Sequence, residues 1–285
     1  MKLKVLKILG FSWVLAFQAF EPALATPLGL KDIMRTEVET DSSIPSPSEF
    51  IGVDLGSKHL LHHEIVRYLD ELSAVSPKIE SLGEYGKTHG GRPLMAYAIS
   101  SAENIKDLQL IKDSRAKIVD PSIDIDVAGQ PAVLHMMYSI HGNEASAANA
   151  TPLLAYYLAA VKDADLEEQI KNVVIILSPV LNPDGLDRFA SWSNNHAGSH
   201  PSDDPNDREH IEPSPNGRTN YYWFDLNRDW LPHQHPETRA LLELFHDWKP
   251  NVQLDFHEQG SNRNFFFMPG VAERTFPLIP RVNQD

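Results

Sequence analysis

The sequence predicts an α/β fold, a three-layer α/β/α sandwich built around a mixed, largely parallel sheet. Two observations predict this architecture. Nearly continuous apolar runs at residues 131–140 and 173–177 are typical of strands that are buried on both faces of a sheet. Segments with helical spacing of apolar residues alternate with these runs, which favours a sheet covered by helices. In such sheets, binding sites gather beyond the C-terminal ends of the strands.

The first half of the chain supplies two helices and two strands. Across residues 59–76, apolar side chains recur at spacings of four, four and three, which predicts one face of an amphipathic helix. Residues 81–91 are punctuated by glycine, and residues 94–99 predict a strand. The apolar run at 131–140 delivers a histidine at its C-terminal end. Residues 145–161, rich in Ala, Leu and Tyr without an internal glycine, predict a helix packed on the sheet.

The second half continues the alternation. The strand at 173–177 leads into residues 182–185, Asn-Pro-Asp-Gly, which predict a turn. Residues 191–220 are crowded with polar residues and proline and predict a long surface loop, a kind of segment that is often functional. Residues 236–248 have helical spacing with Pro and Glu suited to a first turn, and residues 252–256 predict a strand.

The N-terminus predicts export. Residues 1–25 combine three lysines, an apolar run and a small-residue cleavage site after Ala25, the features of a secretory signal peptide. The apolar run is too short for the alternative, a membrane anchor, because spanning takes about 20 apolar residues. We therefore expect a secreted or periplasmic protein without a stable membrane span after cleavage. Residues 26–57 are interpreted as a loosely ordered lead-in, and residues 58–285 as the main folded domain.

Composition narrows the partners and the metal chemistry. The formal net charge is −14, and loss of the signal segment, with three lysines and one glutamate, makes it −16. Such an acidic chain is a poor partner for nucleic acid or an anionic membrane surface. The sequence has no cysteine, so a thiolate metal site is impossible. Any metal must be bound by His, Asp or Glu.

One histidine-carboxylate pattern predicts a metal site. His141 and Glu144 are three residues apart at a junction between strand and helix, where both side chains can turn toward one point. His257 follows the strand at 252–256 and supplies a third ligand. Two imidazoles and one carboxylate leave room for a water on zinc, which is the arrangement of a catalytic site. Asp255 is a candidate for orienting a ligand imidazole.

The other histidines are weaker candidates. His62 and His63 lie on the first helix without matching carboxylates. His233 and His235 lie among prolines, and we interpret them as structural or as residues at the rim of the substrate site.

Four motifs follow one another along the chain: His141-Gly-Asn-Glu144, Asn182-Pro-Asp-Gly185, Asp225-Leu-Asn-Arg-Asp-Trp230 and Asp255-Phe-His257. In this order they resemble the zinc metallocarboxypeptidase family of the carboxypeptidase A and B type, over roughly residues 58–270. The resemblance implies that His141, Glu144 and His257 bind one zinc ion. It also implies that Asn227 and Arg228 are catalytic and substrate-binding residues that hold the C-terminal carboxylate of a peptide. A guanidinium beside an amide suits that task, because it can grip a carboxylate at two points.

The resemblance leaves two roles open. The family has a second arginine, which polarises the scissile carbonyl, and Arg188, Arg208 and Arg218 all remain candidates for it. The family's general-base glutamate and substrate-closing tyrosine lie well after the third zinc ligand. Here only Glu258, Glu273 and Asp285 are acidic after His257, and no tyrosine follows Tyr222. We therefore expect a catalytic domain that is incomplete at its C-terminus.

The expected function is that of an exported zinc metallocarboxypeptidase, which hydrolyses C-terminal peptide bonds once a general-base glutamate beyond residue 285 completes the site. Two alternatives remain open at this point. One is a non-catalytic protein that binds zinc and peptide ends. The other is a related zinc amidohydrolase or deacylase.

Overall fold

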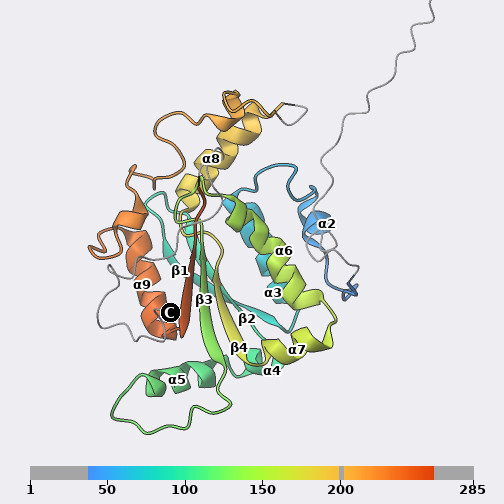
Figure 1. Cartoon of the computed structure of the whole chain (residues 1–285), viewed down its shortest axis with the longest axis vertical. Coiled ribbons are helices and arrows are strands. Elements are labelled where there is room, and N and C mark those ends of the chain that lie inside the picture. Colours follow the sequence, from blue (N-terminus) through green and yellow to red (C-terminus); the bar gives the residue numbers. More distant parts are fainter. Residues whose placement is uncertain (1–37, 199–201, 260–285) are drawn as a thin grey trace, which may run out of the picture.

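The fold is organised around a mixed β-sheet (Figure 1). The computed structural model describes residues 38–198 and 202–259, and within them the sheet has five strands in the order β1-β2-β4-β3-β5. The pairs β1–β2 and β2–β4 are antiparallel, and the pairs β4–β3 and β3–β5 are parallel. The predicted mixed sheet is confirmed. The strands are β1 (Ile79–Lys87), β2 (Pro93–Ile99), β3 (Ala132–Tyr138), β4 (Val173–Ser178) and β5 (Val252–Phe256).

Helices cover both faces of this sheet. Among the described residues they are α2 (Pro47–Ile51), α3 (His62–Val75), α4 (Ala102–Lys106), α5 (Leu108–Ile118), α6 (Ser146–Ala160), α7 (Ala164–Ile170), α8 (Pro183–His196) and α9 (Pro236–Trp248). Two short 3-10 turns, Arg208–His210 and Leu226–Arg228, lie in the segment between α8 and α9. The three helices predicted from apolar spacing and composition are present as α3, α6 and α9, and α9 matches its predicted bounds.

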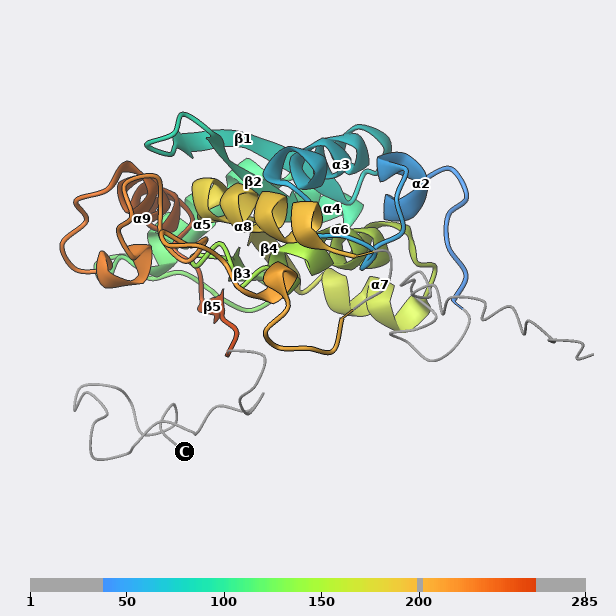
Figure 2. The same ribbon diagram turned by 90° about the horizontal axis from the view of Figure 1, so that it is seen from above.

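Strand β2 shows how the layers form. Its side chains alternate, so Tyr97 and Ile99 enter the hydrophobic core beneath α3 and α6, while Ala96 and Ala98 enter the core beneath α5 and α9. All four side chains are fully buried. Figure 2 shows α5 and α9 on one side of the strands and α3 and α6 on the other. The predicted α/β/α sandwich is therefore confirmed.

The neighbouring parallel strands β3 and β5 position the site. Tyr138 at the end of β3 pairs with Phe256 at the end of β5, and their rings stack with centroids 4.4 Å apart. His141 and His257 come shortly after these two strand ends. Residues separated by more than a hundred positions in sequence are thereby delivered to one edge of the sheet.

The turn predicted at residues 182–185 is wrong, because this motif begins a helix. Asn182 is the N-cap of α8, its Oδ1 accepts a hydrogen bond from the backbone N–H of Gly185 at 2.9 Å, and Pro183 occupies the first turn. Helix α8 then runs to His196, so the predicted loop at 191–220 starts about one and a half turns later than expected.

The glycine-punctuated segment forms most of β1. The register of β1 against β2 shifts between Ser81 and Gly83 and again between Glu84 and Gly86. Such irregularities obscure the alternation by which a strand is predicted. At Gly86, a Cβ atom would lie 2.4 Å from the Cβ of Ala240, so this glycine permits the close approach of α9 to β1.

The lead-in is more ordered than predicted in the part that the structure describes. Ser46 and Glu49 form a reciprocal capping box at the start of α2. Ile44 and Leu55 are buried in the core, and the Tyr68 hydroxyl donates to the carbonyl of Pro45 at 3.0 Å. Residues 38–57 are therefore packed against the domain, in contrast to the expected loose segment.

The predicted signal peptide at residues 1–25 lies outside the described residues, as do residues 26–37 of the lead-in. Among the residues that are described, every helix is too short or too polar to cross a membrane.

Candidate metal centre

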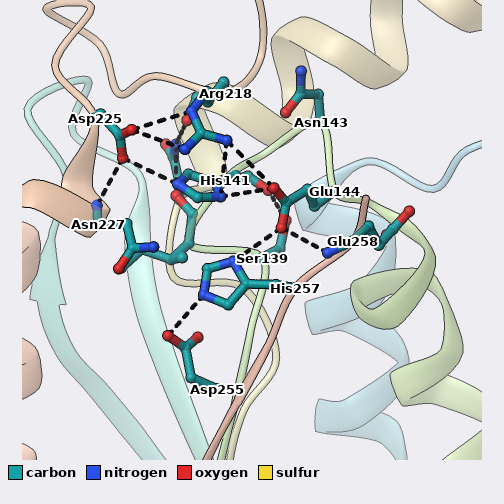
Figure 3. A network of polar contacts seen from close by, with 12 residues as sticks. Ser139, His141, Asn143, Glu144, Arg218, Asp225, Asn227, Asp255, His257 and Glu258 are labelled. Carbon is teal, nitrogen blue, oxygen red and sulfur yellow. Dashed lines mark hydrogen bonds and ion pairs between the residues drawn. The ribbon is translucent and has the colours of Figure 1, made fainter. Parts of the chain in front are cut away.

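His141, Glu144 and His257 meet beyond the C-terminal ends of β3 and β5 (Figure 3). Glu144 lies between the two imidazoles: its Oε1 is 2.8 Å from His141 Nδ1 and its Oε2 is 3.0 Å from His257 Nδ1. One ligand atom of each residue lies within 4.8 Å of the other two. The structure thus brings together the three residues that the sequence analysis selected as metal ligands.

The loop after β3 holds His141 and Glu144 in place. Ser139 has a positive φ of 56°, and its hydroxyl donates to the carbonyl of His141 at 3.0 Å. Asn182 at the start of α8 donates from its backbone to Ser139 and from its side chain to Ile140. Gly142 lies directly against α8, where a Cβ atom would come within 2.1 Å of backbone atoms. The loop and the helix therefore form one packed unit.

Each imidazole is also held from its far side by a carboxylate. His141 Nε2 lies 3.0 Å from Asp225 Oδ1, and His257 Nε2 lies 2.9 Å from Asp255 Oδ2. Both Nδ1 atoms face Glu144, and in the tautomer that would bind a metal through Nδ1 the Nε2–H donates to the carboxylate on the far side. The orienting role considered for Asp255 agrees with this geometry. Asp225, which does the same for His141, was not singled out by the sequence analysis.

Glu144, His257 and Asp255 form an array of ion pairs. Burial opposes ionisation of Glu144, but hydrogen bonds from His141, from His257 and from the backbone N–H of Glu258 outweigh it, so the pKa of Glu144 falls to about 2. The hydrogen bond to Asp255 and then the one to Glu144 raise the pKa of His257 to about 10. A proton on His257 occupies the position where a metal ion would otherwise meet the Nδ1 lone pair.

The donor set fits zinc. Two imidazole nitrogens and one carboxylate oxygen converge, and both imidazoles have the carboxylate support that is typical of zinc ligands. Three protein ligands leave a fourth position for water or substrate.

Arg218 is the arginine that reaches this cluster. Its Nη1 lies 3.4 Å from Glu144 Oε1, and its Nε and Nη2 bind Asp225 Oδ2 at 3.1 and 3.0 Å. The other two candidates lie elsewhere: Arg188 donates to the carbonyls of Asn216, Thr219 and Asn220, and Arg208 lies over the ring of Trp192. Sequence alone did not separate the three, because all lie within or beside the polar segment after β4.

Asn227 and Arg228 lie next to the cluster through Asp225. The backbone N–H of Asn227 donates to Asp225 Oδ1 at 2.9 Å, and the Asn227 side chain accepts from Trp230 Nε1 at 2.6 Å. The Arg228 side chain is exposed and donates to the carbonyl of Asn227 at 3.0 Å. Within the described residues, no contact joins Arg228 to the three predicted ligands.

Arg228 forms no ion pair with its sequence neighbour Asp229 in the described part of the chain. The partner it would need, Asp229, is fully buried and accepts from the backbone of Gln234 and His235 and from the hydroxyl of Thr238. Arg228 is therefore free of Asp229 in the described part of the chain.

Glu258 is directed away from the cluster, as expected for the residue that comes after a ligand on an extended segment. Its carboxylate accepts from the backbone and hydroxyl of Ser146 at 2.6 and 3.0 Å. Only its backbone N–H takes part in the site, by donating to Glu144 Oε2 at 2.8 Å. Figure 3 shows this division between its side chain and its backbone.

The solved structures to which this chain is similar include three carboxypeptidases. A metallo-carboxypeptidase from Burkholderia cenocepacia has 17% identity and a TM-score of 0.45, and the match covers 70% of this chain and 41% of that chain. A metallo-carboxypeptidase from Pseudomonas aeruginosa, in complex with (2-guanidinoethylmercapto)succinic acid, has 18% identity and a TM-score of 0.44, with 70% and 40% covered. Carboxypeptidase A from Helicoverpa armigera has 18% identity and a TM-score of 0.45, with 77% and 50% covered.

The chain thus spans half or less of the length of these three proteins. No curated protein sequence matches it. The family comparison is direct: the zinc carboxypeptidase model matches residues 65–269, well over half of the chain and including the whole cluster. On this match, the chain belongs to the zinc carboxypeptidase family.

Proposed function

We propose that this protein is an exported, zinc-dependent metallocarboxypeptidase that hydrolyses the C-terminal peptide bond of peptides or proteins. The observation that carries the proposal is the convergence of His141, Glu144 and His257 with Arg218 beside them, at the strand ends of a zinc carboxypeptidase domain. This arrangement combines a metal-binding donor set with a cation that is available to a developing negative charge.

The ligand residues prepare the site for one metal ion. His141, Glu144 and His257 would hold zinc, and Asp225 and Asp255 would keep the two imidazoles in the binding tautomer. Bound zinc supplies Lewis acidity toward a carbonyl oxygen and lowers the pKa of a coordinated water.

Arg218, Asn227 and Arg228 would bind different parts of the substrate. Arg218 would donate to the scissile carbonyl, because its guanidinium already lies within 3.4 Å of a predicted metal ligand. Asn227 and the exposed Arg228 would bind the terminal carboxylate of the peptide. A grip on that carboxylate fixes the distance from the chain end to the bond that is cleaved.

The general base would come from outside the described residues. The described carboxylates around the cluster are each engaged: Asp225 by His141 and Arg218, Asp255 by His257, and Glu258 by Ser146. A carboxylate for proton transfer must be within reach of the water that it deprotonates. We therefore propose that a glutamate outside the described residues completes the site.

Peptide hydrolysis tests the proposal. Purified protein that includes the part of the polypeptide carrying the general base is supplied with zinc and incubated with peptides that end in a free carboxylate and with the same peptides amidated at the C-terminus. Release of the last residue from the free acid alone, and its loss in His257→Ala, is the expected result. Zinc binding without cleavage of either peptide would favour the binding protein, and cleavage restricted to acylated amino acids would favour the deacylase.

Export is tested separately. Cell fractionation should find the protein outside the cytoplasm, with a mature N-terminus at Thr26. Full-length protein retained in the cytoplasm would contradict this part of the proposal.

A further inference from the structure

A second group of metal-binding side chains lies outside the centre described above. His89 is in the turn between β1 and β2, His235 is the N-cap of α9, and Glu237 is in the first turn of α9. His89 Nε2 lies 3.1 Å from His235 Nδ1 although 146 positions separate the two residues. One ligand atom of each of the three residues lies within 4.8 Å of the other two.

Glu237 points to a missing partner. Its side chain is only 3% exposed, and Oε1 accepts a hydrogen bond from the backbone N–H of His89 at 3.2 Å. Across residues 38–198 and 202–259, Oε2 is buried and meets no hydrogen-bond donor. A buried carboxylate oxygen without a hydrogen-bond partner destabilises the folded protein. A cation between this carboxylate and the two imidazoles would remove that destabilisation.

The two imidazoles are held at the spacing that a metal requires. Ligands at about 2.0–2.1 Å in tetrahedral geometry are separated by about 3.3 Å, close to the 3.1 Å between the two ring nitrogens. The His235 ring stacks on Phe224 at 4.3 Å, and the His89 ring meets the Tyr222 ring edge-on at 4.9 Å. Packing against these aromatic rings therefore fixes the orientation of both imidazoles before a metal binds.

The backbone of His235 is fixed as well. Its N–H donates to the buried Asp229 at 2.9 Å. One contact would be exchanged on binding: Asn220 Nδ2 lies 3.3 Å from the same His235 Nδ1 that would become a ligand. Asn220 is fully buried, and its side-chain oxygen accepts from the backbone N–H groups of Tyr222 and Phe224 at 3.0 Å, so the loss of this one contact opposes metal binding.

We propose that His89, His235 and Glu237 form a second binding site for a divalent transition metal of the zinc class. The donor set is again two imidazoles and one carboxylate, with no residue shared with the first centre. The bound ion would tie the turn after β1 to the start of α9. It would thereby brace residues 220–235, the segment that also carries Asn227 and Arg228. The inference stands on these residues alone and does not depend on peptidase activity.

Zinc stoichiometry of the full chain tests the proposal. Wild type should bind two zinc ions, and His89→Ala and His257→Ala should each bind one. The double variant His89→Ala/His257→Ala should bind none. His63→Ala is the matched control, because His63 is an exposed histidine outside both groups, and it should bind two. His89 is exposed, so its removal leaves the core intact.

A thermal melt provides a second measurement. Zinc should raise the melting temperature of His257→Ala, and this rise should disappear in His89→Ala/His257→Ala. In the otherwise intact chain, Glu237→Gln should lose the same equivalent of zinc as His89→Ala. If His89→Ala binds as much zinc as wild type, or if Glu237→Gln retains both ions, the second site does not exist.

Discussion

Asp225→Asn is the substitution that tests how the metal centre is supported. Oδ1 of Asp225 accepts from His141 Nε2 at 3.0 Å and from the backbone of Asn227 at 2.9 Å, and Oδ2 accepts from Arg218 at 3.0 and 3.1 Å. Asparagine retains the first acceptor and replaces the second by an NH₂ group, which faces the Arg218 donors. The imidazole of His141 loses a charged partner, while the backbone contact to Asn227 is kept.

Removal of such a supporting carboxylate typically costs 10- to 100-fold in metal affinity, or about 1.4–2.7 kcal/mol. The Asp225 side chain is 22% exposed, so solvent screens part of its charge and we expect a loss nearer to tenfold. The measurement is competition for zinc against a chromogenic chelator at fixed pH, in the His89→Ala background so that one site is observed. Asp203→Asn, at an exposed carboxylate, is the control. Equal affinity in Asp225→Asn and this control would refute the orienting role of Asp225.

Three further predictions concern the same region. Zinc must displace a proton from His257, because the pKa of this histidine is raised to about 10. Zinc affinity should therefore rise about tenfold per pH unit from pH 6 to 8. If zinc affinity instead reaches a plateau above the ordinary histidine pKa of about 6.5, this would contradict the array of ion pairs. Gly142→Ala should lower the free energy of unfolding by about 1–3 kcal/mol and weaken zinc binding, because the new Cβ meets the backbone of Gly185. Chemical denaturation measures this change. Unchanged stability would contradict the prediction and show that α8 can move away from the loop. Arg228→Ala should weaken binding of a peptide with a free C-terminal carboxylate by about 1.5–3 kcal/mol, and Asn227→Ala should weaken it by about 0.5–1.5 kcal/mol. Calorimetry should find that neither substitution changes binding of the amidated peptide. Equal losses for both peptides would exclude the binding of the terminal carboxylate by Asn227 and Arg228.

The metal centre could be predicted from the sequence because its ligands come after regular elements. The apolar runs before His141 and His257 identify two buried strands, and strand ends are where parallel sheets collect their functional residues. The order of the strands was not predictable in the same way. That β3 and β5 are direct neighbours depends on long-range pairing, which leaves no local pattern in the sequence.

Residues in irregular segments were harder to place. Arg218 lies in a polar loop without periodicity, so only the fold distinguishes it from Arg188 and Arg208. The contact of His89 with His235 joins a turn to a helix cap across 146 positions. His89 has no other proposed ligand near it in the sequence, and the proline-rich surroundings of His235 favour a structural or rim role although Glu237 is only two residues away.

The start of α8 at Asn182 could not be decided from its four-residue motif. Asn before Pro begins turns and helices alike, because both need a side-chain acceptor and a fixed φ. Residues further along the chain favour the helix: Leu186 and Ala190 are both buried, and they give α8 an apolar stripe to pack.

Anomalous diffraction at the zinc absorption edge, from crystals grown with zinc, tests the central claim most directly. We predict a peak at about 2.0–2.2 Å from Nδ1 of His141, Nδ1 of His257 and the carboxylate of Glu144. A fully zinc-loaded crystal that lacks a peak at this position would contradict the assignment of this site as the metal centre.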